Sequence, residues 1–248
     1  MAVLTTGPAR LVSDLHLQGG DDPVRQRFFT FLNQCATAEI DALFILGDLF
    51  EAWIGDDALD DSPARDVAAA LRHLANRGVR VFFMGGNRDF LVGKNFADAA
   101  GMCLIDDPTA ACIAGHHVLL MHGDTLCTDD VGYMAFRQQV RETAWQRTFL
   151  ARPLAERSAE AARMREGSRQ AQAVKPDDIM DVNAEAVAAT LARHHANVLI
   201  HGHTHRPAHH TLNTPQGTAN RWVLSDWTNT RADALAINDQ GFERISLV

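Results

Sequence analysis

Five short apolar segments, each followed at once by a turn that carries Asp, Asn or His, constrain the fold of this chain most strongly. They are rich in Val, Ile, Leu and Phe, as buried strands are, and span residues 10–12, 42–46, 80–84, 117–121 and 197–201. Helical patterns separate several of them, at residues 24–36, 64–76, 90–100 and 184–194. Alternating strands and helices predict an α/β fold with a parallel sheet, whose strand ends share one edge.

Two further regions depart from this alternation. Residues 131–173 have a helical pattern throughout, and they lie between two of the turns that carry Asp, Asn or His. After residue 207, short apolar runs separated by Asn, Asp and Gly predict an antiparallel sheet with strands at 208–212, 222–224, 234–237 and 242–247. We therefore expect a core formed by residues 1–130 and 176–248, with residues 131–175 inserted as a helical cap beside the site.

The composition excludes several classes of protein. Of 248 residues, 46% are hydrophobic and 22% are charged, which is typical of a folded globular chain. The longest apolar run is far shorter than the ~18 residues of a membrane span, and residues 1–10 lack the layout of a signal peptide, so a cytoplasmic protein is expected. Four cysteines without a C-x-x-C pair indicate neither a disulfide framework nor a zinc knuckle.

The charge is unevenly distributed along the chain. The net charge of −8 argues against nucleic acid as a partner, because nucleic-acid binding needs a basic surface. The predicted cap has nine basic and four acidic residues, hence a net charge of +5, whereas the remainder carries −13. This local positive charge indicates either a site for an anionic ligand or lipid surface, or simply a solvated helical face.

The polar turns offer ligands for metal ions. They read Ser13-Asp14-Leu15-His16, Gly47-Asp48, Gly86-Asn87-Arg88-Asp89, His122-Gly123-Asp124 and Gly202-His203-Thr204-His205. On straight strands Asp14 and His16 would point the same way, as would His203 and His205, so each pair could grip one ion. Mixed nitrogen and oxygen ligands without thiolate suit Mn²⁺, Fe, Zn²⁺ or Co²⁺. Because seven ligands are too many for one ion, we expect two cations and hydrolysis of a phosphoester or phosphoanhydride.

The order and spacing of these turns resemble the calcineurin-like metallophosphoesterase superfamily. Longer runs are similar to its family of UDP-2,3-diacylglucosamine pyrophosphohydrolases, which act in lipid A biosynthesis: GDLFEAWIGDD at 47–57, GNRDFLVGK at 86–94, HGDTLCTDD at 122–130, IMDVN at 179–183 and IHGHTHRP at 200–207. The resemblance covers about residues 11–208 and implies an αββα sandwich of two mixed sheets with a helical cap. The stretch from Asn213 onward matches poorly, so no role is carried over to it.

The resemblance also implies roles for individual residues. Two manganese ions would be held, one by Asp14, His16, Asp48 and His205, and the other by Asp48, Asn87, His122 and His203. Asp48, Asn87, Arg88 and His203 would be catalytic, and the substrate contacts would be Asn87, Arg88, Asp130, Ser168, Gln172, Lys175 and His203. Asn is expected in the family where this chain has Gln172. The implied reaction splits a UDP-linked diacylglucosamine into UMP and 2,3-diacylglucosamine 1-phosphate, by attack of water on the α-phosphate.

Arg88 and the cap carry independent information. Many superfamily members have a histidine at the position of Arg88, which can protonate a poor alkoxide leaving group. A phosphomonoester leaving group, with a second pKa of about 6, needs no such acid, so Arg88 favours an anhydride substrate. In the cap, Tyr133, Phe136, Val140, Trp145 and Phe149 could line a cavity for two acyl chains or could simply pack the cap helices together.

The expected setting is a monomer on the cytoplasmic face of the inner membrane, peripherally bound through the arginines of the cap. Two other functions remain open at this point. One is a general metallophosphoesterase that acts on dinucleotides or other phosphoesters, and the second is a non-catalytic scaffold on the same fold. A scaffold is expected to have lost metal ligands, whereas all seven are present here.

Overall fold

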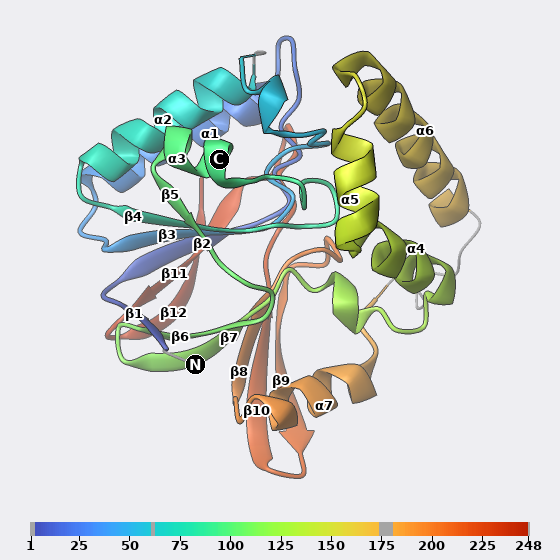
Figure 1. The fold of residues 1–248 in the computed structure, drawn as a ribbon. Coiled ribbons are helices and arrows are strands. Elements are labelled where there is room, and N and C mark those ends of the chain that lie inside the picture. The colour runs from blue at the N-terminus through green and yellow to red at the C-terminus, as the bar shows by residue number, and fades with distance from the viewer. Residues whose placement is uncertain (1–2, 61–62, 174–180, 248) are drawn as a thin grey trace.

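Two six-stranded mixed sheets form the centre of the computed structural model, which describes residues 3–60, 63–173 and 181–247 (Figure 1). In spatial order, the first sheet contains β1 (Leu4–Thr6), β6 (Thr109–Ile113), β7 (His116–Leu120), β8 (Val198–His201), β10 (Gly217–Val223) and β9 (Ala208–Thr214). The second contains β12 (Gly241–Ser246), β11 (Asp233–Asn238), β2 (Ala9–Val12), β3 (Ala42–Leu46), β4 (Arg80–Met84) and β5 (Met102–Leu104). Strands β2 to β5 run parallel, as the alternating pattern predicts.

Helices cover the outer faces of both sheets. α1 (Pro23–Thr37), α2 (Ala64–Asn76) and α3 (Lys94–Ala100) lie on the second sheet, and α7 (Ala184–Arg193) lies on the first (Figure 1). Strand β3 is buried on both faces: Leu43 and Ile45 pack with the helices, whereas Phe44 and Leu46 pack between the sheets. A strand buried on both faces reads as a continuous apolar run, which is how β3 appears in the sequence. These layers confirm the expected αββα sandwich.

The prediction that the last four strands form one antiparallel sheet is wrong, because they form two hairpins that belong to different sheets. The hairpin β9–β10 extends the first sheet, where β10 runs parallel to β8. The hairpin β11–β12 extends the second sheet, where β11 runs antiparallel to β2. Hairpin pairing is local and visible in sequence, but the choice of sheet edge depends on long-range packing.

The predicted helix at residues 90–100 begins only at Lys94. Gly93 stands at its N-cap, and Asp56 of the short 3₁₀ helix η1 (Asp56–Ala58) accepts hydrogen bonds from the backbone nitrogens of Gly93 (2.9 Å) and Phe96 (3.1 Å). A carboxylate at a helix N-terminus satisfies free N–H groups and is favoured by the helix dipole. Because this cap comes from a distant loop, the periodicity of the sequence cannot locate the helix start. Strands β1, β5 and β6 were likewise not expected.

The helical insertion forms three helices beside the carboxyl ends of the strands (Figure 1). They are α4 (Val131–Arg141), α5 (Thr143–Leu150) and α6 (Leu154–Ala173). Asp130 caps α4 by accepting from the backbone nitrogen of Tyr133, and Phe149 of α5 is buried in the core. The cap boundary predicted at residue 175 lies outside the described residues. None of the helices in the described ranges is long and apolar enough to span a membrane.

Candidate active site

The structure gathers the seven candidate ligands at the carboxyl ends of five strands from both sheets. Asp14 and His16 follow β2, Asp48 follows β3, Asn87 follows β4, His122 follows β7, and His203 and His205 follow β8. The short 3₁₀ helix η2 (Asp124–Leu126) begins directly after the His122 turn. The site therefore lies where the edges of the two sheets meet, as expected for strand ends in an α/β fold.

One group of side chains converges around Asp14 and two imidazoles. His16 Nε2 lies 3.3 Å from His205 Nε2, and His205 Nε2 lies 3.5 Å from Asp14 Oδ1. Asp14 Oδ2 accepts hydrogen bonds from Ser13 Oγ (2.6 Å) and from the backbone nitrogen of His203 (2.8 Å). Asp14 Oδ1 is buried and has no hydrogen-bond partner among the described groups. A buried carboxylate oxygen without a partner fits a cation ligand.

A second group converges on the side-chain oxygen of Asn87. His122 Nε2 and His203 Nδ1 each lie 2.9 Å from Asn87 Oδ1. His122 Nδ1 lies 2.9 Å from the carbonyl oxygen of Leu46 and must carry a proton there, since a carbonyl only accepts. Nε2 of His122 is thus the nitrogen available to an ion.

Asp48 lies between the two groups. Its Oδ2 is 3.9 Å from His16 Nε2, and its Oδ1 is 3.7 Å from His122 Nε2. The Asp48 side chain is 2% exposed, so both oxygens are directed into the site rather than into solvent. This placement is what a carboxylate that bridges two cations requires.

Five of the seven candidate ligands have a left-handed backbone. The φ angles are 54° for Asp14, 49° for His16, 55° for Asp48, 68° for His203 and 56° for His205. The expectation that each Asp-x-His or His-x-His pair sits on a straight strand is therefore wrong, because these residues lie in turns beyond the strand ends. Left-handed conformations at non-glycine residues are costly and cluster at functional sites.

Glycines allow the backbones of these turns to approach the ligands closely. A Cβ on Gly86 would lie 2.1 Å from Asp48 Oδ1, and one on Gly202 would lie 2.3 Å from Asp14 Oδ2. No side chain fits at either position without displacing a carboxylate. The glycines of the turns are thus required by the packing of the site.

Asp89 has a role that the sequence reasoning missed. Its buried carboxylate accepts from the backbone nitrogens of Asp48 (3.2 Å), Phe50 (3.2 Å) and Gly86 (2.9 Å). Asp89 thus ties the Asp48 turn to the turn that carries Asn87. Its place in the Gly86–Asp89 turn was the available signal, but nothing in the sequence shows that its partners are backbone groups.

The electrostatics favour cations. Burial alone would lower the pKa of His122, but the carboxylates of Asp48, Asp14 and Asp124 raise it to about 9. Burial would raise the pKa of Asp14, yet its histidine neighbours hold the pKa of this carboxyl far below its usual range. For His203, burial and the neighbouring His122 lower the pKa to about 4, so this imidazole is neutral. Carboxylates and a neutral imidazole fit two divalent cations without thiolate ligands.

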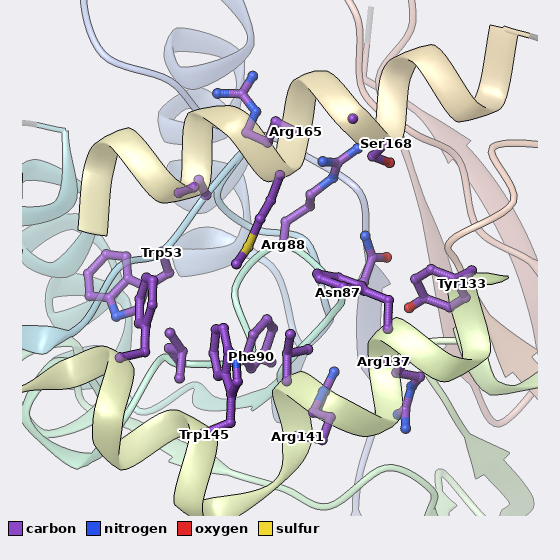
Figure 2. Close-up of a pocket in the computed structure, with 18 of the residues that line it drawn as sticks. Trp53, Asn87, Arg88, Phe90, Tyr133, Arg137, Arg141, Trp145, Arg165 and Ser168 are labelled. Carbon is purple, nitrogen blue, oxygen red and sulfur yellow. The ribbon is translucent and has the colours of Figure 1, made fainter. Parts of the chain in front are cut away.

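A cavity of about 570 Å³ opens beside this site, between the core and the cap (Figure 2). α6 runs along one side and α4 and α5 along the other, and Asn87, Arg88 and Phe90 enter from the core. Its lining includes Tyr133, Phe136, Val140, Trp145 and Phe149, the five apolar and aromatic residues singled out in the cap sequence. Cap packing and cavity lining are both present, since Trp145 also stacks on Phe149 with ring centroids 4.9 Å apart.

The expected substrate contacts are distributed around this cavity. Asn87, Arg88, Asp130 and Ser168 line it, and His203 lies next to Asn87 at the metal-ligand cluster. Arg88 Nε is buried without a hydrogen-bond partner among the described residues. The side chain of Gln172 and the whole of Lys175 lie outside the described residues.

Asp124 joins the cap to the site, another role that the sequence reasoning missed. This carboxylate is fully buried and accepts hydrogen bonds from Tyr133 Oη (2.6 Å) and Arg137 Nε (2.7 Å), one turn apart on α4. The tyrosine ring lies 5.9 Å from the ring of His203. In the sequence, the only sign of this contact is that Tyr133 and Arg137 are four residues apart, and so on one face of a helix, shortly after the turn with Asp124.

Comparisons with known proteins agree with this geometry. The family model for calcineurin-like phosphoesterases matches residues 8–207. UDP-2,3-diacylglucosamine hydrolase from Salmonella dublin is 51% identical over 217 residues, which cover 87% of this chain and 89% of the relative. The hydrolase of the same name from Salmonella agona (strain SL483) is 50% identical with the same coverage.

Among solved structures, a dimetal phosphatase from Danio rerio aligns with 98% of this chain and 99% of its own, at 14% identity and a TM-score of 0.47. The family assignment depends on the sequence relatives and the family model. The chain belongs to the calcineurin-like phosphoesterases and, within them, to the family of UDP-2,3-diacylglucosamine hydrolases.

Proposed function

We propose that this chain hydrolyses UDP-2,3-diacylglucosamine at its diphosphate and releases UMP and 2,3-diacylglucosamine 1-phosphate. One observation carries the proposal: the cluster of candidate metal ligands adjoins an apolar cavity, and Arg88 and Asn87 lie in its wall. A diphosphate at the cluster would place an attached diacylated sugar in this cavity. The relatives named for the same substrate support this assignment.

We assign two Mn²⁺ ions to the two groups of ligands, with Asp48 shared between them. Such a pair of cations lowers the pKa of a water molecule and offsets the charge of the phosphoryl oxygens. The unpartnered Asp14 Oδ1 and the convergence of His122 and His203 on Asn87 Oδ1 support this ligand set. Nitrogen and oxygen donors without thiolate also fit manganese.

In the proposed reaction, water gives up a proton to the solvent, its oxygen bonds to the α-phosphorus, and the bond from that phosphorus to the bridging oxygen breaks. The bond electrons leave with the sugar phosphate, whose second pKa of about 6 makes protonation unnecessary. Arg88 can bind the charge that develops on the diphosphate, since it lines the cavity and its buried Nε makes no hydrogen bond to the described groups. Asn87 and His203 hold the phosphoryl group in place next to it.

We further propose that the cap selects the acyl chains and rests on an anionic membrane surface, at the cytoplasmic face of the inner membrane. The cap exposes Val131 (74%), Phe136 (38%) and Leu150 (39%). Arg163 and Arg169 of α6 are 73% and 78% exposed. Apolar side chains among arginines are typical of a surface that binds anionic lipid headgroups. Binding to anionic liposomes should weaken as salt rises, and salt-independent binding would contradict this part of the proposal.

The decisive experiment compares three substrates with purified, manganese-loaded protein. UMP release is followed with UDP-2,3-diacylglucosamine and with UDP-glucosamine, and phosphate release is followed with p-nitrophenyl phosphate. We expect rapid UMP release from the acylated substrate alone. Equal or faster cleavage of UDP-glucosamine or p-nitrophenyl phosphate would instead favour the second candidate, a general metallophosphoesterase, and would refute the lipid assignment.

A further inference from the structure

The carboxylate of Glu51 contacts both the metal-ligand cluster and the cap. Its Oε2 lies 3.0 Å from His16 Nδ1, and its Oε1 lies 2.6 Å from Arg165 Nη2. His16 follows β2 in the core, whereas Arg165 lies in the middle of α6. The side chains of Glu51 and His16 are 19% and 17% exposed, whereas that of Arg165 is 43% exposed, so the contact with His16 is the more shielded of the two.

The surroundings keep Glu51 anionic. Burial alone would raise its pKa, but His16, Arg88 and Arg165 together hold the pKa of this carboxyl below its usual value. For His16, burial would lower the pKa, and Glu51, Asp48 and Asp14 raise it. In the structure the Glu51 carboxylate lies between one candidate ligand, His16, and Arg165 of the cap.

The described part of α6 is attached to the core at two places. Near its N-terminus, the fully buried Arg157 pairs with Asp57 and donates to the carbonyl oxygen of Ile54. In the middle, Arg165 pairs with Glu51. Two other arginines pair within the helix, Arg163 with Glu160 and Arg169 with Glu166.

Arg165 and Ser168 belong to the same helix, α6, and both are among the residues that line the cavity (Figure 2). They are three residues apart and so lie on neighbouring positions of one helix face. The pair between Glu51 and Arg165 is therefore one of the contacts that hold this face of α6 near the cluster.

We infer that Glu51 is a positioning residue that couples cation binding at His16 to the placement of α6. An imidazole that binds a cation through Nε2 carries its proton on Nδ1, and His16 Nδ1 lies 3.0 Å from Glu51 Oε2, an ion-pair contact without hydrogen-bond geometry. The contact orients the carboxylate, and its other oxygen then holds Arg165. Coupling of this kind is reciprocal, so a bound cation and a docked α6 stabilise each other. The inference rests on the proposed role of His16 as a cation ligand.

The test measures manganese affinity by calorimetry and deuterium uptake of the α6 segment with and without manganese. In the wild type, manganese should slow exchange in α6. Glu51→Gln keeps the size of the side chain but removes its charge. It should weaken manganese binding about 10- to 100-fold and abolish the effect of manganese on α6.

Two further variants separate coupling from a merely structural role. Arg165→Gln leaves the contact between Glu51 and His16 in place, so α6 should lose its response to manganese while the affinity falls only about two- to fivefold. Glu160→Gln removes an ion pair within α6 and should match the wild type in both measurements.

Exchange in α6 that is independent of manganese in the wild type would overturn the inference, as would Glu51→Gln with unchanged affinity and response. If Glu51→Gln fails to fold, Arg165→Gln still decides the matter, because an unchanged response of α6 in that variant would refute the coupling. Neither readout uses the lipid substrate. A protein that releases UMP but shows no response of α6 refutes the coupling alone, whereas a protein that binds no manganese refutes the proposed function.

Discussion

Replacing Arg88 by alanine separates the contribution of its guanidinium from that of its backbone. The backbone nitrogen of Arg88 donates to Asp48 Oδ1 (2.8 Å), and its carbonyl oxygen accepts from the backbone nitrogen of Trp53 (3.1 Å). Alanine keeps both bonds, so the turn that supports the Asp48 carboxylate should stay in place. Only the side chain that lines the cavity is removed.

The magnitude follows from what the guanidinium can do. A preorganised donor directed at developing charge contributes about 10²- to 10³-fold to turnover, or about 3–4 kcal/mol of transition-state stabilisation. We therefore expect kcat for UMP release to fall by this factor in Arg88→Ala. Manganese affinity should stay within about twofold of the wild type, a change of about 0.4 kcal/mol, because the guanidinium is not one of the candidate ligands and the backbone contact to Asp48 is kept.

The assay measures UMP release at saturating manganese, with manganese affinity determined separately by calorimetry. Arg77→Ala serves as the matched control, because Arg77 is exposed at the C-terminal end of α2, and it should behave as the wild type. If Arg88→Ala loses manganese affinity in proportion to kcat, Arg88 is structural and the reasoning is refuted.

Three further predictions address the ligands and the cavity. Gly86→Ala should abolish manganese binding in calorimetry, because its Cβ would lie 2.1 Å from Asp48 Oδ1. Gly167→Ala is the control: its Cβ would meet nothing within 4 Å, so this variant should bind manganese as the wild type does. Normal binding by Gly86→Ala would contradict the close approach of the backbone to Asp48. His122, with its pKa of about 9, must release a proton to bind a cation, so manganese affinity should rise about tenfold per pH unit between pH 7 and 8.5. A flat pH profile would show that this imidazole is already neutral. Trp145→Ala should raise KM for the acylated substrate about tenfold while manganese affinity stays unchanged, and an unchanged KM would exclude a role in chain binding.

The positions of the candidate ligands were predictable because a general rule of α/β folds brings strand ends to one edge. Asp14, Asp48 and His122 each follow a run that is recognisable as a buried strand, so their proximity needed no knowledge of side-chain packing. The five cap residues that line the cavity were also recognisable, because they form an apolar set on helices placed beside the site.

Contacts between distant segments were not predictable. Arg157 and Asp57 are 100 residues apart, and their pairing depends on how α6 lies across the core. The sequence places Asp89 and Asp124 in the polar turns and Glu51 close after one, but it does not show that each of these carboxylates binds a group on a distant segment. Sequence patterns report periodicity and turn chemistry, whereas these roles depend on tertiary geometry.

The left-handed ligand turns were the other feature that sequence could not show, and they store strain. A non-glycine residue in the left-handed region raises the conformational free energy by roughly 1–2 kcal/mol. Five candidate ligands adopt it, so the rest of the structure must offset several kcal/mol of backbone strain. Backbone bonds hold the turns in this conformation: the nitrogen of Asp14 donates to Gly47 (3.1 Å), and that of His16 donates to Asp48 (3.0 Å). In the proposed ligand roles, this strain would direct the side chains at the cations before the cations bind.

This strain can be measured at His205, where the side chain is 43% exposed and φ is 56°. His205→Ala and His205→Gly both remove the imidazole, so they lose the same ligand and little buried surface. They differ in the backbone, because only glycine adopts this φ without a steric cost. After chelation of metal, the glycine variant should be more stable by about 1 kcal/mol, which corresponds to a Tm about 2–4 °C higher for a chain of this size. If the alanine variant melts at the same temperature or higher, the turn is not strained, and the energy that orients the ligands must come from the side-chain contacts alone.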